Sequence, residues 1–454
     1  MILQPQQRRL FRHVRWSASS PGTMLQRNTG HRALTTGHHP RRPRKSYPVQ
    51  SGAAEAQLAS AFLRHSLFGP GDAGLRFKID AVERDEFQAL EETFQTEGSE
   101  AVFDRLIRRA RGEKDHRLLF AVRLMACRHR LGLPLLETEP VVDVGSEQRP
   151  AYEAAFREAV REAGELCLAG GDIVGAWPYF QAIGEREAMA AAIETVSGGD
   201  HLDRVIEIAY QEGVNPRKGF ELILEHHGVC RAISWFPSNR DYGSRQACLR
   251  LLVRTLYGEL ARNLKETIAA TEGASPETDG VAQLIAGRAW LFEGSSYYVD
   301  STHLASVLGF APELQDRESL RMAWEMANYG DHLAPMFHFR GDPPFEDIYL
   351  DHAVYLKALL NEEVDVAIGH FRRKAAEAGD STAAEVLIDL LVRLNRYPEA
   401  IAASMEYFPD VNAAPRGCPS AAQLCQLAGD YATLRNVARQ RGDLLGFAAG
   451  VIQS

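Results

Sequence analysis

The sequence predicts an all-α fold built as an array of antiparallel helical hairpins, an α-solenoid. From about residue 55 onward, apolar residues recur at spacings of three and four, the period of a helix with one buried face. Short breaks containing Gly, Asn or Pro separate these stretches, as expected where one helix ends and the next begins. The only plausible strand, "PVVDV" at 140–144, is too short to build a sheet.

Length and composition are those of a soluble globular chain. At 454 residues it exceeds what one core usually supports, so several domains or one extended array are expected. The 45% hydrophobic and 24% charged residues are ordinary values for soluble domains. No stretch approaches the roughly 18 to 20 uninterrupted apolar residues that a membrane helix needs, so we expect no membrane partner.

The first 54 residues differ from the rest in charge. They contain ten Lys or Arg and no Asp or Glu, which leaves 41 basic against 60 acidic residues in the remainder. We predict that 1–54 is a disordered basic leader outside the fold; its Arg- and Ser-rich make-up also fits an organellar transit peptide, although five prolines weaken the required helix. The acidic remainder argues against a nucleic-acid partner, which would need clustered Lys and Arg.

Periodicity and composition divide the rest of the chain into four helical segments. A proline- and glycine-rich stretch at 131–150 separates the first two. The predicted segments are an N-terminal helical segment at 55–135, a helical-repeat segment at 150–200, a central segment rich in His and aromatic residues at 201–375, and a C-terminal helical-repeat segment at 376–454.

Three stretches repeat a helix, a short break and a second helix. The breaks are Gly-Gly-Asp at 170–172, Asn-Arg-Tyr-Pro at 395–398 and Gly-Asp at 429–430. With "LNRYPEAIAASMEYF" at 394–408, the chain resembles the tetratricopeptide family of helical hairpins over about 160–190 and 380–450. The resemblance implies stacked antiparallel helix pairs, because such pairs bury their apolar faces only against neighbours.

Helix ends can also be read from single residues. Asn215 is expected to cap a helix that has Pro216 at its first position, and Gly228 is expected to end it. In "FRGDPPFEDIYLDH", Asp342 is expected to cap a helix that begins with Pro343.

The six cysteines indicate a reducing compartment. None forms a C-x-x-C pair and no secretory apolar segment opens the chain, so we expect free, mostly buried thiols and a cytoplasmic protein. Cys230 follows His227 by three residues, and we expect it to be a buried structural thiol rather than a nucleophile.

Histidines and acids cluster in the central segment. His227, His303 and His352 are expected to be substantially buried, and two of them, His227 and His352, continue apolar helix stripes. Asp300 precedes His303 by one helical turn and is expected to orient its ring. The candidate central site is His227, Asp300, His303, His332, His338, Asp351 and His352.

These residues permit two interpretations. Imidazole and carboxylate are ligands for zinc, iron or manganese, so His227, His303 and His352 are candidate ligands of a divalent metal, and we expect at least two of them to approach each other. Alternatively, they are core histidines that hydrogen-bond to neighbours. No H-E-x-x-H, phosphate-loop, dinucleotide or nucleophile-elbow motif is present, so no reaction or cofactor follows from the sequence.

We expect the chain to be a helical-repeat scaffold that binds a protein or peptide. The alternative is a metal-dependent enzyme or metal-binding protein with its site in the central segment. An enzyme needs polar groups that converge in a pocket, whereas a scaffold needs an open groove.

Overall fold

The computed structural model describes residues 84–454, except 137–143, 378–380, 410–414 and 416. Within these ranges the chain is all-α, and its only β pairing is an isolated bridge between Arg340 and Asp347. The prediction of an all-α fold is confirmed for these residues. None of the described helices has the length and apolar character needed to cross a membrane. The predicted leader, 1–54, lies outside the described residues, as does most of "PVVDV".

The described residues form two compact units, 84–219 and 220–454, and the division falls inside helix α9 (Pro216–Trp235). Helix α9 begins as predicted, because Asn215 accepts a hydrogen bond from the Lys218 amide at 3.2 Å. Its regular winding is interrupted at Gly228, whose φ is 78°. The division lies within the predicted central segment, 201–375.

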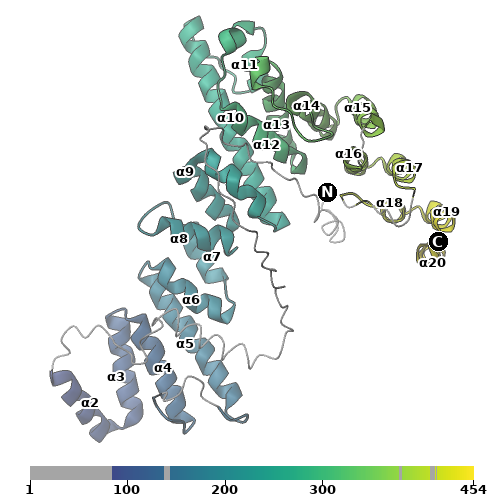
Figure 1. The fold of residues 1–454 in the computed structure, drawn as a ribbon. Coiled ribbons are helices and arrows are strands. Elements are labelled where there is room, and N and C mark those ends of the chain that lie inside the picture. The colour runs from purple at the N-terminus through teal and green to yellow at the C-terminus, as the bar shows by residue number, and fades with distance from the viewer. Residues whose placement is uncertain (1–83, 137–143, 378–380, 410–414, 416) are drawn as a thin grey trace, which may run out of the picture. The chain divides into compact units, whose positions relative to one another are not determined.

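The first unit is a succession of helices, most of them packed on the next (Figure 1). Their bounds are α2 (Arg84–Glu97), α3 (Ser99–Gly112), α4 (His116–Arg130), α5 (Arg149–Ala169), α6 (Ile173–Ile183), α7 (Glu187–Glu194), α8 (Leu202–Ile206) and the short π-helix η2 (Glu207–Gln211). Large side chains such as Phe156, Trp177 and Phe180 fill the core between α4, α5 and α6. Burial of these faces is the main term that stabilises the unit.

Gly-Asp pairs end one helix and begin the next, as predicted. Gly171, with φ 80°, follows α5, and Asp172 accepts a hydrogen bond from the Gly175 amide at 2.7 Å to cap α6. Gly429, with φ 68°, and Asp430 do the same between α18 (Ala421–Ala428) and α19 (Tyr431–Arg441). The positive φ favours glycine, and the aspartate satisfies an amide that the helix leaves unpaired.

The second unit is a longer succession of helices. It contains the rest of α9, then η3 (Phe236–Ser238), α10 (Tyr242–Glu272), α11 (Val281–Ile285), η4 (Ala289–Ser295), α12 (Ser301–Phe310), η5 (Ala311–Glu313), α13 (Arg317–Asp331), η6 (Pro335–Phe337), α14 (Ile348–Leu359), α15 (Val364–Glu377), α16 (Thr382–Arg393), α17 (Tyr397–Tyr407), α18 (Ala421–Ala428), α19 (Tyr431–Arg441) and α20 (Leu444–Ile452). Helix α10 is much the longest of these, at 31 residues.

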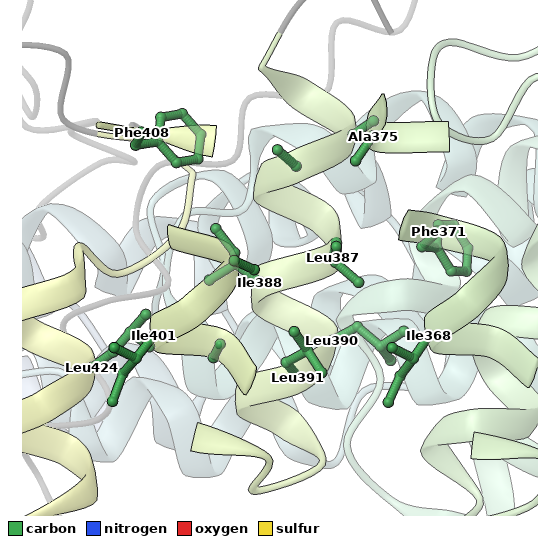
Figure 2. Close-up of a cluster of buried hydrophobic side chains, with 14 of the residues drawn as sticks. Ile368, Phe371, Ala375, Leu387, Ile388, Leu390, Leu391, Ile401, Phe408 and Leu424 are labelled. Carbon is green, nitrogen blue, oxygen red and sulfur yellow. The ribbon is translucent and has the colours of Figure 1, made fainter. Parts of the chain in front are cut away.

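One apolar core joins the helices from α14 to α19. Figure 2 shows Phe371 of α15, Leu387 and Leu391 of α16, Ile401 of α17 and Leu424 of α18 within this cluster. The cluster runs across position 375/376, where the sequence analysis placed a segment boundary.

The beginning of α14 differs from the prediction. Asp347, not Asp342, is the N-cap, and it accepts a hydrogen bond from the Leu350 amide at 3.1 Å. The prediction that Pro343 begins this helix is wrong. Pro343 precedes Pro344, and a residue before proline is sterically disfavoured in the helical conformation. The chain therefore turns through 342–346 before the helix begins.

Ser420→Ala is expected to destabilise α18 by about 1 kcal/mol. Ser420 forms a capping box, in which its hydroxyl accepts from the Gln423 amide while the Gln423 side chain accepts from the Ser420 amide. Hydrogen-exchange mass spectrometry of the full chain measures the change as faster exchange in α18. Ser420→Asp preserves the cap and should leave exchange unchanged; equal exchange in the alanine variant would contradict the role of the cap.

Candidate functional site

The three predicted metal ligands, His227, His303 and His352, differ in their burial. His227 is exposed, so the prediction that it is buried is wrong. It lies in the last turn before Gly228 interrupts the helix, so the apolar stripe no longer faces a core at this position. His303 is half-buried and only His352 is fully buried, at 2% exposure. Helical spacing predicts which residues share a face of a helix, but it does not predict at which turn that face stops being covered by the core.

Three of the predicted histidines donate a hydrogen bond from a ring nitrogen to a backbone carbonyl four or five residues earlier in the chain. His332 donates to Asn328 O at 2.8 Å, His338 to Leu333 O at 3.0 Å, and His352 to Ile348 O at 2.6 Å. Each ring is therefore held locally, but only His352 is a buried, hydrogen-bonded core histidine; His338 is half-buried and His332 is exposed.

Asp300 does not orient the ring of His303, as the sequence analysis expected. Its carboxylate caps α12 instead, accepting from the amides of Thr302 and His303 at 2.8 and 3.2 Å. These bonds and that of the Thr302 hydroxyl lower the pKa of Asp300, the hydroxyl contributing most. Asp300 is therefore a helix cap.

Asp351 is the centre of a buried polar cluster that links α14 to α15. It is 1% exposed, and its Oδ1 accepts from His370 Nε2 at 2.7 Å. Its Oδ2 accepts from Lys374 Nζ at 2.7 Å and from the Asp347 amide at 2.9 Å. Lys374 also donates to Glu346 at 2.5 Å. Both Asp351 oxygens are occupied, so this carboxylate serves as a clamp between helices.

Asp351 was predicted as a site residue, but its partners His370 and Lys374 were not. His370 and Lys374 lie at i and i+4 on α15, so they share one face, and this spacing was the available signal. Burial opposes the charge of Lys374, whereas its hydrogen bonds to Asp351 and Glu346 raise its pKa. Lys374 therefore stays charged beside the buried carboxylate.

Cys230 is exposed, so the prediction of a buried thiol at this position is wrong. It follows the break at Gly228 on the outer side of α9. All six cysteines are free thiols, and Cys127, Cys167, Cys248 and Cys425 are buried, as expected for most of them.

An open groove runs along α10 and α13. Its larger part is a cleft of about 770 Å³, lined on α10 by Tyr257, Gly258, Ala261, Lys265 and Ala269 and on α13 by Met322, among others. A second cleft of about 490 Å³ shares Tyr257, Glu318 and Met322 with it. The two clefts are therefore parts of one elongated groove. No histidine or cysteine lines either cleft.

Small residues form the floor of this groove because they recur on one face of α10. Gly258, Ala261 and Ala269 share this face with Lys265, since consecutive members of the four are spaced by three or four residues. Gly258 is exposed within the interior of the helix, and a Cβ built there would meet nothing within 4 Å. Glycine in a helix interior costs about 0.5–1 kcal/mol relative to alanine. The described fold itself does not require this glycine.

Ion pairs border the groove on both sides. Arg254 of α10 lies 2.7 Å from Glu318 of α13, and Lys265 lies 2.5 Å from Asp279. Tyr257 donates to Glu325 at 2.6 Å, and burial, followed by this carboxylate, raises the pKa of its hydroxyl. The lining therefore combines small floor residues with charged side chains of both signs, Arg262 and Glu266 among them, and the two ion pairs form its rim.

Comparison with known proteins found no match: neither a protein-family model, nor a curated protein, nor a solved structure resembles the chain.

Proposed function

We propose that the chain is a helical-repeat scaffold that binds one amphipathic helix of a partner protein in the groove along α10 and α13. We further propose that its helices stack as tetratricopeptide-like antiparallel hairpins, with the exposed face of α10 serving as the docking surface. A cytoplasmic location fits this proposal, because the six free thiols need a reducing compartment to stay unpaired.

Gly258 is the observation that carries the proposal. Its position costs helix stability, and no neighbour within the described fold occupies the space of the absent side chain. A partner helix accounts for it, since small residues allow two helix backbones to approach closely.

The shape and border of the groove favour a helix over a small molecule. From Arg254 to Ala269 it follows α10 for about four turns, or roughly 22 Å at 1.5 Å per residue. A partner helix bound along the groove would pack its apolar stripe against the floor and against Met322. The flexible side chain of Met322 can adapt to different apolar surfaces. The mixed charges of the rim suit a partner helix that carries both signs on its flanks.

Peptide selection tests this proposal directly. A displayed library of amphipathic helical peptides is selected against the full chain, and the dissociation constants of the selected peptides are measured. We expect Gly258→Trp, which fills the groove, to weaken binding at least tenfold, equivalent to about 1.4 kcal/mol. Gly258→Ala should weaken it less, while stabilising α10 by about 0.5–1 kcal/mol.

Gly369 provides the matched control. It also lies inside a helix, α15, where a Cβ would meet only Arg373 Nη1 at 4.0 Å, and it is remote in sequence from the groove. Gly369→Trp should leave peptide binding unchanged. Peptides that bind Gly258→Trp as tightly as the unaltered chain would overturn the proposal, as would a selection that yields no binder.

A further inference from the structure

In the 84–219 unit, three potential metal ligands from different helices lie together. They are His116, Cys167 and Asp172, and one ligand atom from each lies within 4.8 Å of the others. His116 is the first residue of α4, Cys167 is in the last turn of α5, and Asp172 is the N-cap of α6. The packing of three consecutive helices therefore brings an imidazole, a thiol and a carboxylate to one point.

Neighbouring residues hold two of these ligands in place. His116 Nδ1 lies 2.9 Å from the hydroxyl of Tyr179, whose ring meets the imidazole edge to face at 5.6 Å. Asp172 uses Oδ1 to accept from the Gly175 amide at 2.7 Å. A side chain at Gly175 would collide with the Asp172 carboxylate, since its Cβ would lie 2.2 Å from Oδ2. Such outer contacts orient metal ligands in known sites.

The three ligands differ in solvent exposure, so that the site is shielded on one side and open to an entering ion on the other. Cys167 is 2% exposed, His116 is half-buried and Asp172 is exposed. The thiol is thus shielded, while the carboxylate side is open to solvent. An ion can enter from that side, and a water molecule can complete the coordination there.

We propose that His116, Cys167 and Asp172 bind a divalent transition metal, with Zn²⁺ the best match to this set. Sulfur, imidazole nitrogen and carboxylate oxygen are the donors that zinc takes in proteins, at about 2.0–2.3 Å. In a tetrahedron those bond lengths separate ligand atoms by roughly 3.3–3.8 Å. The ligand atoms, which lie within 4.8 Å of one another, must therefore approach by side-chain shifts on the order of 1 Å to bind the metal.

Binding replaces the thiol proton of Cys167 with the metal, and the proton leaves to solvent. The metal would tie the start of α4 to the ends of α5 and α6. Because it binds the folded unit, it also stabilises that unit by mass action.

Cobalt titration tests the site, because Co²⁺ takes zinc sites and reports its ligands by absorption. The full chain, reduced and freed of metal with a chelator, is titrated with Co²⁺ alone. We expect one equivalent to bind, with a thiolate-to-cobalt charge-transfer band and visible tetrahedral bands that Zn²⁺ then abolishes. The absence of a thiolate band in the unaltered chain overturns the proposal.

Variants then assign the ligands. Cys167→Ser should abolish the charge-transfer band, and Cys127→Ser, which alters another buried thiol of this unit, should preserve it. Asp172→Asn retains an N-cap side chain and should weaken Co²⁺ binding at least tenfold with an unchanged helical spectrum. A band that persists in Cys167→Ser, or unchanged affinity in Asp172→Asn, contradicts the assignment. The asparagine variant keeps the test decisive even where Cys167→Ser fails to fold.

Discussion

Lys374→Met is expected to destabilise the packing of α14 on α15 by about 3–5 kcal/mol. The variant removes the cation that lies 2.7 Å from Asp351 and leaves a carboxylate that is 1% exposed. Breaking a buried pair on one side is costly because the remaining charge stays out of water. The free energy of opening is measured by hydrogen-exchange mass spectrometry, which reports on α14 and α15 separately from other helices.

Two further variants separate the buried charge from lost packing. Adding Asp351→Asn to Lys374→Met should restore part of the loss, since it removes the buried negative charge that Lys374 no longer balances. Lys357→Met is the matched control: Lys357 pairs at 2.6 Å with Glu363, which is 59% exposed, so its loss should cost under about 1 kcal/mol. If the two lysine variants cost the same, or if the asparagine gives no rescue, Asp351 is not the clamp described above.

The fold was predictable from local sequence patterns because each helix must bury an apolar face and must be terminated at both ends, and both requirements leave a pattern in the sequence. Apolar residues at helical spacing mark a face that must be buried, and this holds from α3 through α19. Gly171 with Asp172, and Gly429 with Asp430, mark helix ends because a left-handed residue and a capping side chain are both needed there. Such signals depend on neighbours within four residues.

The candidate sites were less predictable because they depend on packing between helices. Asp351 meets His370 only where α14 packs on α15. The spacing of His370 and Lys374 places both on one face of α15, but it does not show which residue of another helix they contact. The ligand group of His116 and Cys167 likewise arises from residues about fifty positions apart. Local reasoning instead grouped histidines that are close in sequence, such as His227, which the structure leaves exposed.

Stability of the 220–454 unit is expected to fall by about 3 kcal/mol between neutral pH and about pH 4 through His352 alone. This side chain is 2% exposed, its ring stacks on Phe345 at 4.3 Å, and its Nε2 is buried without a hydrogen-bond partner among the described residues. Burial lowers the pKa of His352 from 6.5 to about 4, partly opposed by the hydrogen bond to Ile348 O. The folded ring therefore stays neutral in a range where the unfolded ring is protonated.

The sign follows from which state takes up the proton. Below pH 6.5 His352 is protonated in the unfolded chain but stays neutral in the folded chain. The free energy of unfolding therefore declines as the pH falls towards about 4 and then levels off. The gap between 6.5 and about 4, at about 1.4 kcal/mol per pKa unit, gives about 3 kcal/mol. Above pH 6.5 both states are neutral at this residue, and it contributes no pH dependence.

His352→Phe isolates this contribution from other acid-sensitive groups, including the Asp351 and His370 pair. The phenyl ring keeps the stacking on Phe345, removes the unpartnered nitrogen and cannot titrate. Opening free energies of α14 from hydrogen exchange, corrected for intrinsic rates, are compared at pH 7 and pH 4.5. The phenylalanine variant should lose about 2.5 kcal/mol less than the unaltered chain across this interval. His332→Phe, which alters an exposed ring, should retain the full decline. Equal declines of the opening free energy in all three chains would show that the ring of His352 is protonated in the folded state, so that burial does not lower its pKa.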